Sequence, residues 1–110
     1  MTWQRRVMKR TLLDLVHALT GPDPRSRARA ADEVTDVHRS LSEDDVAVLT
    51  HVLVAARLVE ANRTCHGAQL HAMAELDERH DLPAEAIGRL RSLESPADDP
   101  SQLEYLQGLI

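Results

Sequence analysis

The chain is a series of amphipathic segments of helical period, separated by short breaks rich in Gly, Pro and Asp. In the first segment apolar residues recur every three or four positions, as at Leu12, Leu15, Val16 and Leu19, which marks one side of an α-helix. Comparable stripes predict six helices, over residues 3–20, 24–40, 42–60, 63–80, 83–94 and 100–110. No window alternates with period two, so the sequence predicts one all-α domain over residues 1–110.

The break between the first two helices is the most informative stretch of the sequence. Gly21-Pro22 ends the first helix, Asp23 is placed to cap the second, and Pro24 takes its first position. Ala30 and Ala31 then give the second helix a side of small residues. This side predicts close packing against a neighbouring helix.

The helix over 42–60 is the most apolar segment of the chain. Ser42 is a good N-cap for it, and Asp45 occupies its third helical position. Its apolar positions cover most of its circumference: Val46, Leu49, Val52, Leu53, Ala56 and Val59, with further apolar residues on a second side. We expect such a helix to be central and covered on both flanks.

The six helices divide into three antiparallel hairpins spaced by roughly 40 residues, a length typical of HEAT and armadillo units. The segment Gly21-Pro22-Asp23-Pro24-x-x-Arg27-x-x-Ala30-Ala31-x-x-Val34 resembles the inner-helix pattern of the HEAT-repeat family. The resemblance implies a solenoid of stacked hairpins, in which Asp23 and Arg27 form a ladder between neighbouring units. Ser26 departs from the pattern, and the second and third units match it weakly, so a compact helical bundle remains the alternative.

Charge is unevenly distributed along the chain. The net charge is −5, but from Leu41 onward thirteen acidic residues face five arginines. An acidic surface disfavours nucleic acid and attracts a partner with a basic surface. The basic residues Arg5, Arg6, Lys9 and Arg10 are interpreted as a solvated face or as an intramolecular match to the acidic half, and not as a membrane or nucleic-acid site.

The lone Cys65 excludes a disulfide within the chain and suits a reducing compartment. We therefore expect a cytoplasmic protein. Arginine far outnumbers lysine and alanine is abundant, a composition typical of a GC-rich bacterial genome.

The candidate chemical groups do not assemble into a reactive site. His66 and His71 are separated by about 140° on a helix, and His71 with Glu75 supplies only two metal ligands. Cys65 and His66 are adjacent and point about 100° apart, so they cannot form a nucleophile–base hydrogen bond. The sequence therefore predicts no metal, no cofactor and no catalysis.

Two polar stripes are the candidate binding surface. Arg25, Arg29, Asp32 and Asp36 share one side of the second helix, and His71, Glu75 and Glu78 share one side of the fourth. By resemblance to HEAT arrays, whose inner helices line a concave surface, these stripes would face a protein partner. The residues predicted to bind it are Arg29, Asp32, Asp36, His71, Glu75 and Glu78.

Size, charge and fold class together indicate a non-catalytic protein-binding module. Compact acidic all-α bacterial proteins of this size are similar to immunity proteins, which neutralise basic toxins by charge complementarity. The alternative is a small regulatory or adaptor protein that forms a homodimer. Leu109 and Ile110 would then belong to an incompletely covered end of the helical array.

Overall fold

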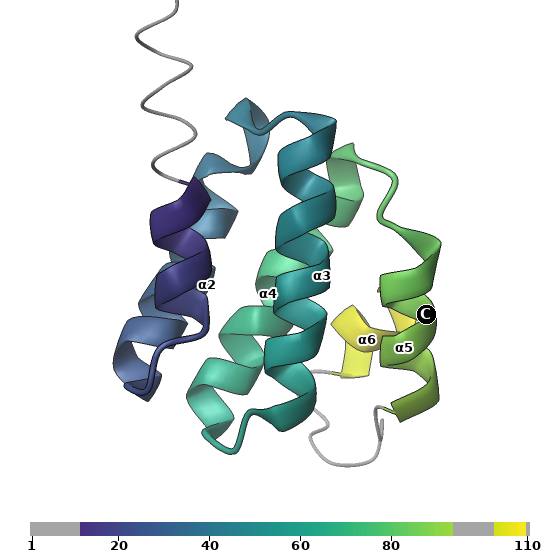
Figure 1. The fold of residues 1–110 in the computed structure, drawn as a ribbon. Helices are drawn as coiled ribbons and strands as arrows, with labels where there is room; N and C mark the ends of the chain where they lie inside the picture. The colour runs from purple at the N-terminus through teal and green to yellow at the C-terminus, as the bar shows by residue number, and fades with distance from the viewer. Residues whose placement is uncertain (1–11, 94–102, 110) are drawn as a thin grey trace, which may run out of the picture.

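The computed structural model describes residues 12–93 and 103–109, and every regular element in those two ranges is helical (Figure 1). The elements are a helical segment over 12–19, α2 (Pro24–Val37), the 3₁₀ helix η1 (His38–Ser40), α3 (Glu43–Val59), α4 (Arg63–Arg79), α5 (Ala84–Leu93) and α6 (Leu103–Leu109). The prediction of an all-α fold is confirmed. The predicted basic group at the N-terminus, the turn near 95–100 and Ile110 lie outside the described residues.

The helix starts follow the capping chemistry expected from the sequence. Asp23, Ser42 and Asn62 cap α2, α3 and α4, each accepting a hydrogen bond from a backbone N–H of the first turn. Ser42 and Asp45 form a reciprocal capping box. Because these caps fix where each helix begins, the starts fall within about one residue of the prediction.

The helices form two layers (Figure 1). One layer contains the 12–19 segment, α3 and α5, and the other contains α2, α4 and α6. Among the labelled helices α2 packs most extensively on α4, α6 also packs on α4, and α3 contacts both α4 and α5. The core between the layers is built mainly from Leu, Val and Ala, including Leu19, Ala31, Val34, Leu49, Leu53, Leu70, Leu76 and Leu90.

The two helices α2 and α4 run side by side in the same direction. At their N-terminal ends Arg27 of α2 binds Glu60, which lies just before α4. At their C-terminal ends the Nε2 atom of His80 lies 3.4 Å from the carbonyl oxygen of His38. The first two helical hairpins are therefore stacked in register, with equivalent helices parallel.

The expectation for the 42–60 helix is met along its middle and is wrong at its end. Val46, Leu49 and Leu53 are buried, and α3 lies between the 12–19 segment and α5 in its layer (Figure 1). Val59, predicted to be on the buried side, is 83% exposed. It is the last residue of α3 and borders an open hollow at the hairpin turn, where no helix of the described ranges covers it.

Candidate functional site

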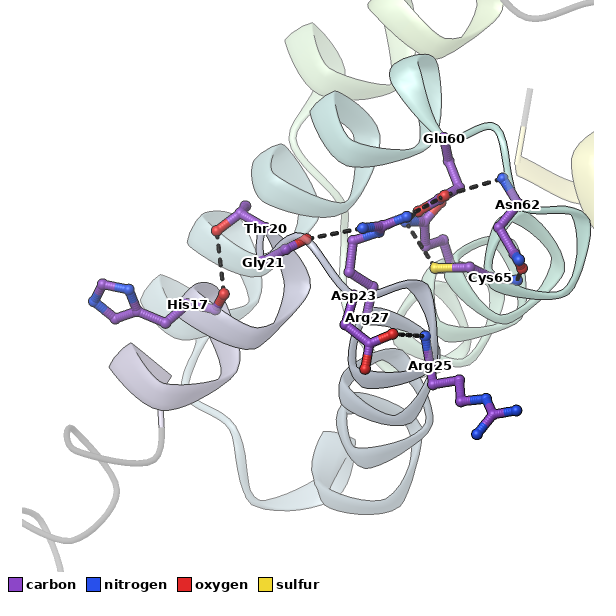
Figure 2. A network of polar contacts seen from close by, with 10 residues as sticks. His17, Thr20, Gly21, Asp23, Arg25, Arg27, Glu60, Asn62 and Cys65 are labelled. Atoms are coloured by element: carbon purple, nitrogen blue, oxygen red, sulfur yellow. Dashed lines mark hydrogen bonds and ion pairs between the residues drawn. The ribbon is translucent and has the colours of Figure 1, made fainter.

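A partly buried charged cluster joins the first hairpin to the second at the N-terminal ends of α2 and α4 (Figure 2). The Arg27 guanidinium donates two hydrogen bonds to the Glu60 carboxylate, from Nε at 2.7 Å and from Nη2 at 2.8 Å. Its Nη1 atom donates to the carbonyl oxygen of Gly21 at 2.9 Å. Arg27 thus holds the turn of its own hairpin and the end of α3 together. We call Arg27, Glu60, Cys65 and Gln69 the seam.

Glu60 is the acceptor at the centre of the seam. Its side chain is only 2% exposed. Besides the two bonds from Arg27, it accepts hydrogen bonds from the backbone N–H of Asn62 at 3.1 Å and from Nε2 of Gln69 at 3.1 Å. The bonds from Arg27 lower the pKa of Glu60 to about 2, against the opposing effect of burial, and the pKa of Arg27 is raised in turn. The pair is fully charged at neutral pH.

Cys65 and Gln69 complete the seam on α4. Burial, together with hydrogen bonding to the neighbouring Glu60, raises the pKa of the Cys65 thiol to about 12. The thiolate is the reactive form of cysteine, so this buried thiol is a poor nucleophile at neutral pH. Gln69 is completely buried, and its Oε1 atom has no hydrogen-bond partner in the described part of the chain.

The carboxylate that meets Arg27 differs from the one the family resemblance implied. Asp23 caps its own helix, accepting from the backbone N–H of Arg25 at 3.2 Å and from the Ser26 hydroxyl at 3.1 Å. Glu60 instead supplies the contact between hairpins. Glu60 and the buried Gln69 were not among the predicted site residues, because neither belongs to an apolar stripe or to a motif of the sequence.

The α2 stripe consists of Arg25, Arg29, Asp32 and Asp36. All four side chains are exposed on the side of α2 opposite its buried residues Ala30, Ala31 and Val34. Within residues 12–93 and 103–109 none of these four side chains takes part in an ion pair or a hydrogen bond. The stripe carries two positive and two negative charges, so its net charge is zero.

The α4 stripe consists of His71, Glu75 and Glu78. The Nε2 atom of His71 lies 3.3 Å from Oε1 of Glu75, one turn away. The His71 ring also packs against the ring of Tyr105 on α6, with centroids 5.4 Å apart and a tilt of 58°. Glu78 is exposed. This stripe is therefore acidic and has an aromatic contact beside it.

The structure places the six predicted binding residues on two adjacent parallel helices. Arg29, Asp32 and Asp36 are exposed on α2, and Glu78 is exposed on α4, whereas His71 and Glu75 are half-buried. Toward the N-terminal ends of the two helices lies a hollow of about 480 Å³ lined by Arg25, Ala28, Arg29, Asp32, Asn62 and Thr64, among others. A second hollow, of about 410 Å³, lies between the hairpin turns beside the seam.

Within the described ranges no group of three or more His, Cys, Asp or Glu side chains could hold a metal ion. None of the helices described has the length and apolar character needed to cross a membrane. No known family model, curated protein or solved structure matches this chain. A proposal about function therefore has to come from the geometry and charge of its surface.

Proposed function

We propose that this protein is a non-catalytic protein-binding module, built from stacked helical hairpins of the HEAT type, that binds a partner with a basic surface. The layered arrangement and the parallel packing of α2 on α4 support the hairpin-stack part of this proposal. Its specific form is an acidic immunity protein that neutralises a basic toxin in the cytoplasm of a bacterium.

The observation that carries the proposal is the α4 stripe. His71 lies between Glu75 and Tyr105, which orients the imidazole. Glu75 is half-buried beside it, and Glu78 is exposed on the same side of α4. Aromatic residues beside ordered charges are typical of the residues that dominate protein–protein binding. Tyr105 is 43% exposed, enough to contact a partner.

The chemistry of the seam supports a structural role for the buried polar groups. Arg27 and Glu60 neutralise each other, and the Cys65 thiol stays protonated at neutral pH. Arg27, Glu60 and Cys65 are therefore in contact with one another and are not available to a partner. The α2 stripe and the exposed part of the α4 stripe remain as the groups available to a partner.

The proposal is tested by charge reversal on α4. The wild-type protein is first used to capture its partner from an extract of the native cell. The purified partner is then titrated into the wild type and into each variant, and the binding affinity is measured by calorimetry. Glu75→Lys with Glu78→Lys should weaken binding by at least about tenfold, and raised salt should weaken wild-type binding, because attraction between exposed charges is screened.

The matched control is Glu85→Lys, which removes an exposed acid on α5 at a distance from the stripe. This variant should bind as the wild type does. A partner that binds the doubly reversed α4 variant with unchanged affinity would refute the proposed surface.

A further inference from the structure

The α2 stripe has an ordered sequence of charges. Its two arginines, Arg25 and Arg29, lie in the first half of α2, and its two aspartates, Asp32 and Asp36, lie in the second half. At about 100° per residue the four positions fall within about 60° of one another, so they form a single line along the helix. The line is antisymmetric about the midpoint between Ala30 and Ala31: each arginine has an aspartate at the same distance on the other side.

This order is unfavourable for an isolated α2. The helix macrodipole favours acidic residues in the first turn and basic residues in the last, and α2 has neither. Arg25 and Arg29 are four residues apart and repel each other, as Asp32 and Asp36 do. Arg29 and Asp32 are close enough in sequence to pair, but no ion pair forms between them in the described structure. The Asp23 carboxylate at the N-cap offsets the missing acid of the first turn in part, but the four charges of the α2 stripe have no partner among the described residues.

We infer that the α2 stripe binds the α2 stripe of a second copy of this chain, with the two helices antiparallel about a two-fold axis through their midpoints. Arg25 then lies opposite Asp36 of the second copy, and Arg29 lies opposite its Asp32. Two-fold symmetry repeats each contact. A parallel arrangement would place arginine against arginine and aspartate against aspartate, so the charge order selects the antiparallel one.

The surroundings of the stripe fit this arrangement. The hollow of about 480 Å³ beside Arg25 and Arg29 is open along α2 and α4, and it provides room for an aspartate side chain of the second copy. The antiparallel pairing also brings the positive end of each helix macrodipole near the negative end of the other. Because the contacts are exposed ion pairs, we expect the association to weaken with salt.

This inference goes beyond the proposed function. The proposed function depends on the α4 stripe, which is acidic, whereas self-association depends on the α2 stripe, which has no net charge. Reversing charges on one helix leaves the other unchanged, so each proposal can fail while the other holds.

The test is sedimentation equilibrium of the full chain, at protein concentrations up to about 1 mM, at low and at high salt. Arg25→Glu with Arg29→Glu makes the stripe entirely acidic, and Asp32→Arg with Asp36→Arg makes it entirely basic. Each variant alone should associate at least about tenfold more weakly than the wild type, because like charges then face each other. An equimolar mixture of the two variants should form a heterodimer.

A matched control exchanges charges elsewhere. Glu85→Arg with Arg89→Glu on α5 alters two exposed residues outside the stripe and should associate as the wild type does. A wild type that is monomeric at about 1 mM in low salt would overturn the inference, as would a mixture that stays monomeric. Loss of association in the acidic variant alone would also overturn it, since the two arginines would then contact an acidic surface elsewhere on the second copy and not its α2 stripe.

Discussion

Arg25, Arg27 and Arg29 lie within about one turn of α2, yet the structure gives them two different environments. The Arg27 side chain is 19% exposed and bound to Glu60 and Gly21. Arg25 and Arg29 are exposed, and their side chains have no bonded partner among the described residues. The side of the helix on which an arginine lies, and not its residue type, therefore decides whether it stabilises the fold or is available to a partner.

The largest effect is expected from removing the acid of the seam. Glu60→Ala leaves the Arg27 guanidinium without its carboxylate and removes an acceptor from the buried Gln69. We expect the free energy of unfolding to fall by about 2 to 4 kcal/mol, measured by urea denaturation. Glu78→Ala, which removes an exposed acid from α4, should change it by no more than about 0.5 kcal/mol. Equal losses of unfolding free energy in the two variants would show that Glu60 stabilises the fold no more than an exposed acid does.

A second prediction concerns pH. The pKa of Glu60 is lowered from 4.5 to about 2 in the folded protein, so between these values the unfolded state binds more protons than the folded state. The stabilisation is therefore present above about pH 4.5 and is lost as the pH falls toward 2. Unfolding measured from pH 6 to pH 2 should show the wild type losing more stability than Glu60→Gln. Parallel pH profiles for the two proteins would show that Glu60 is not held charged by Arg27.

The smallest expected effect is an increase in the free energy of unfolding, caused by changes in the α2 stripe. Arg25→Glu places an acid near the start of α2, and Asp36→Lys places a base near its end, as the macrodipole prefers. Each single change should raise the free energy of unfolding by about 0.3 to 1 kcal/mol when measured at low protein concentration. The same changes should weaken self-association. A variant that loses both stability and association would show that the stripe supports the fold.

The sequence predicted the helices well because local rules determine them. Asp23 and Pro24 fix the start of α2, and Ala30 and Ala31 give it a small-residue side on which α4 packs closely. The exposure of the α2 stripe also followed from helical periodicity, since its residues lie opposite the buried side of α2. On the α4 stripe the same rule holds for Glu78 but not for His71, which packs against Tyr105 of α6. These features need no knowledge of distant parts of the chain.

The seam could not be predicted in the same way. Glu60 lies 33 residues from Arg27 in the sequence, and the two meet only because the hairpins stack in register. Gln69 is buried on α4, where it donates a hydrogen bond to Glu60, and a polar residue gives no sign of burial in the sequence. The predicted burial of Val59 was wrong for the opposite reason. An apolar residue at the end of a helix can lie beyond the neighbouring elements that cover the rest of that helix. Contacts of this kind depend on how helices are placed and not on local pattern.

In our proposal the seam side of α2 stabilises the fold, and its exposed side binds a second copy. The most direct test is the urea midpoint of unfolding as a function of protein concentration, measured for Arg27→Gln, Arg29→Gln and the wild type. The wild-type midpoint should rise with concentration, because association stabilises the folded state. Arg27→Gln should lower the midpoint at every concentration and keep the rise. Arg29→Gln should keep the low-concentration midpoint and reduce the rise. A wild-type midpoint independent of concentration, or equal losses at low concentration for the two variants, would contradict the account.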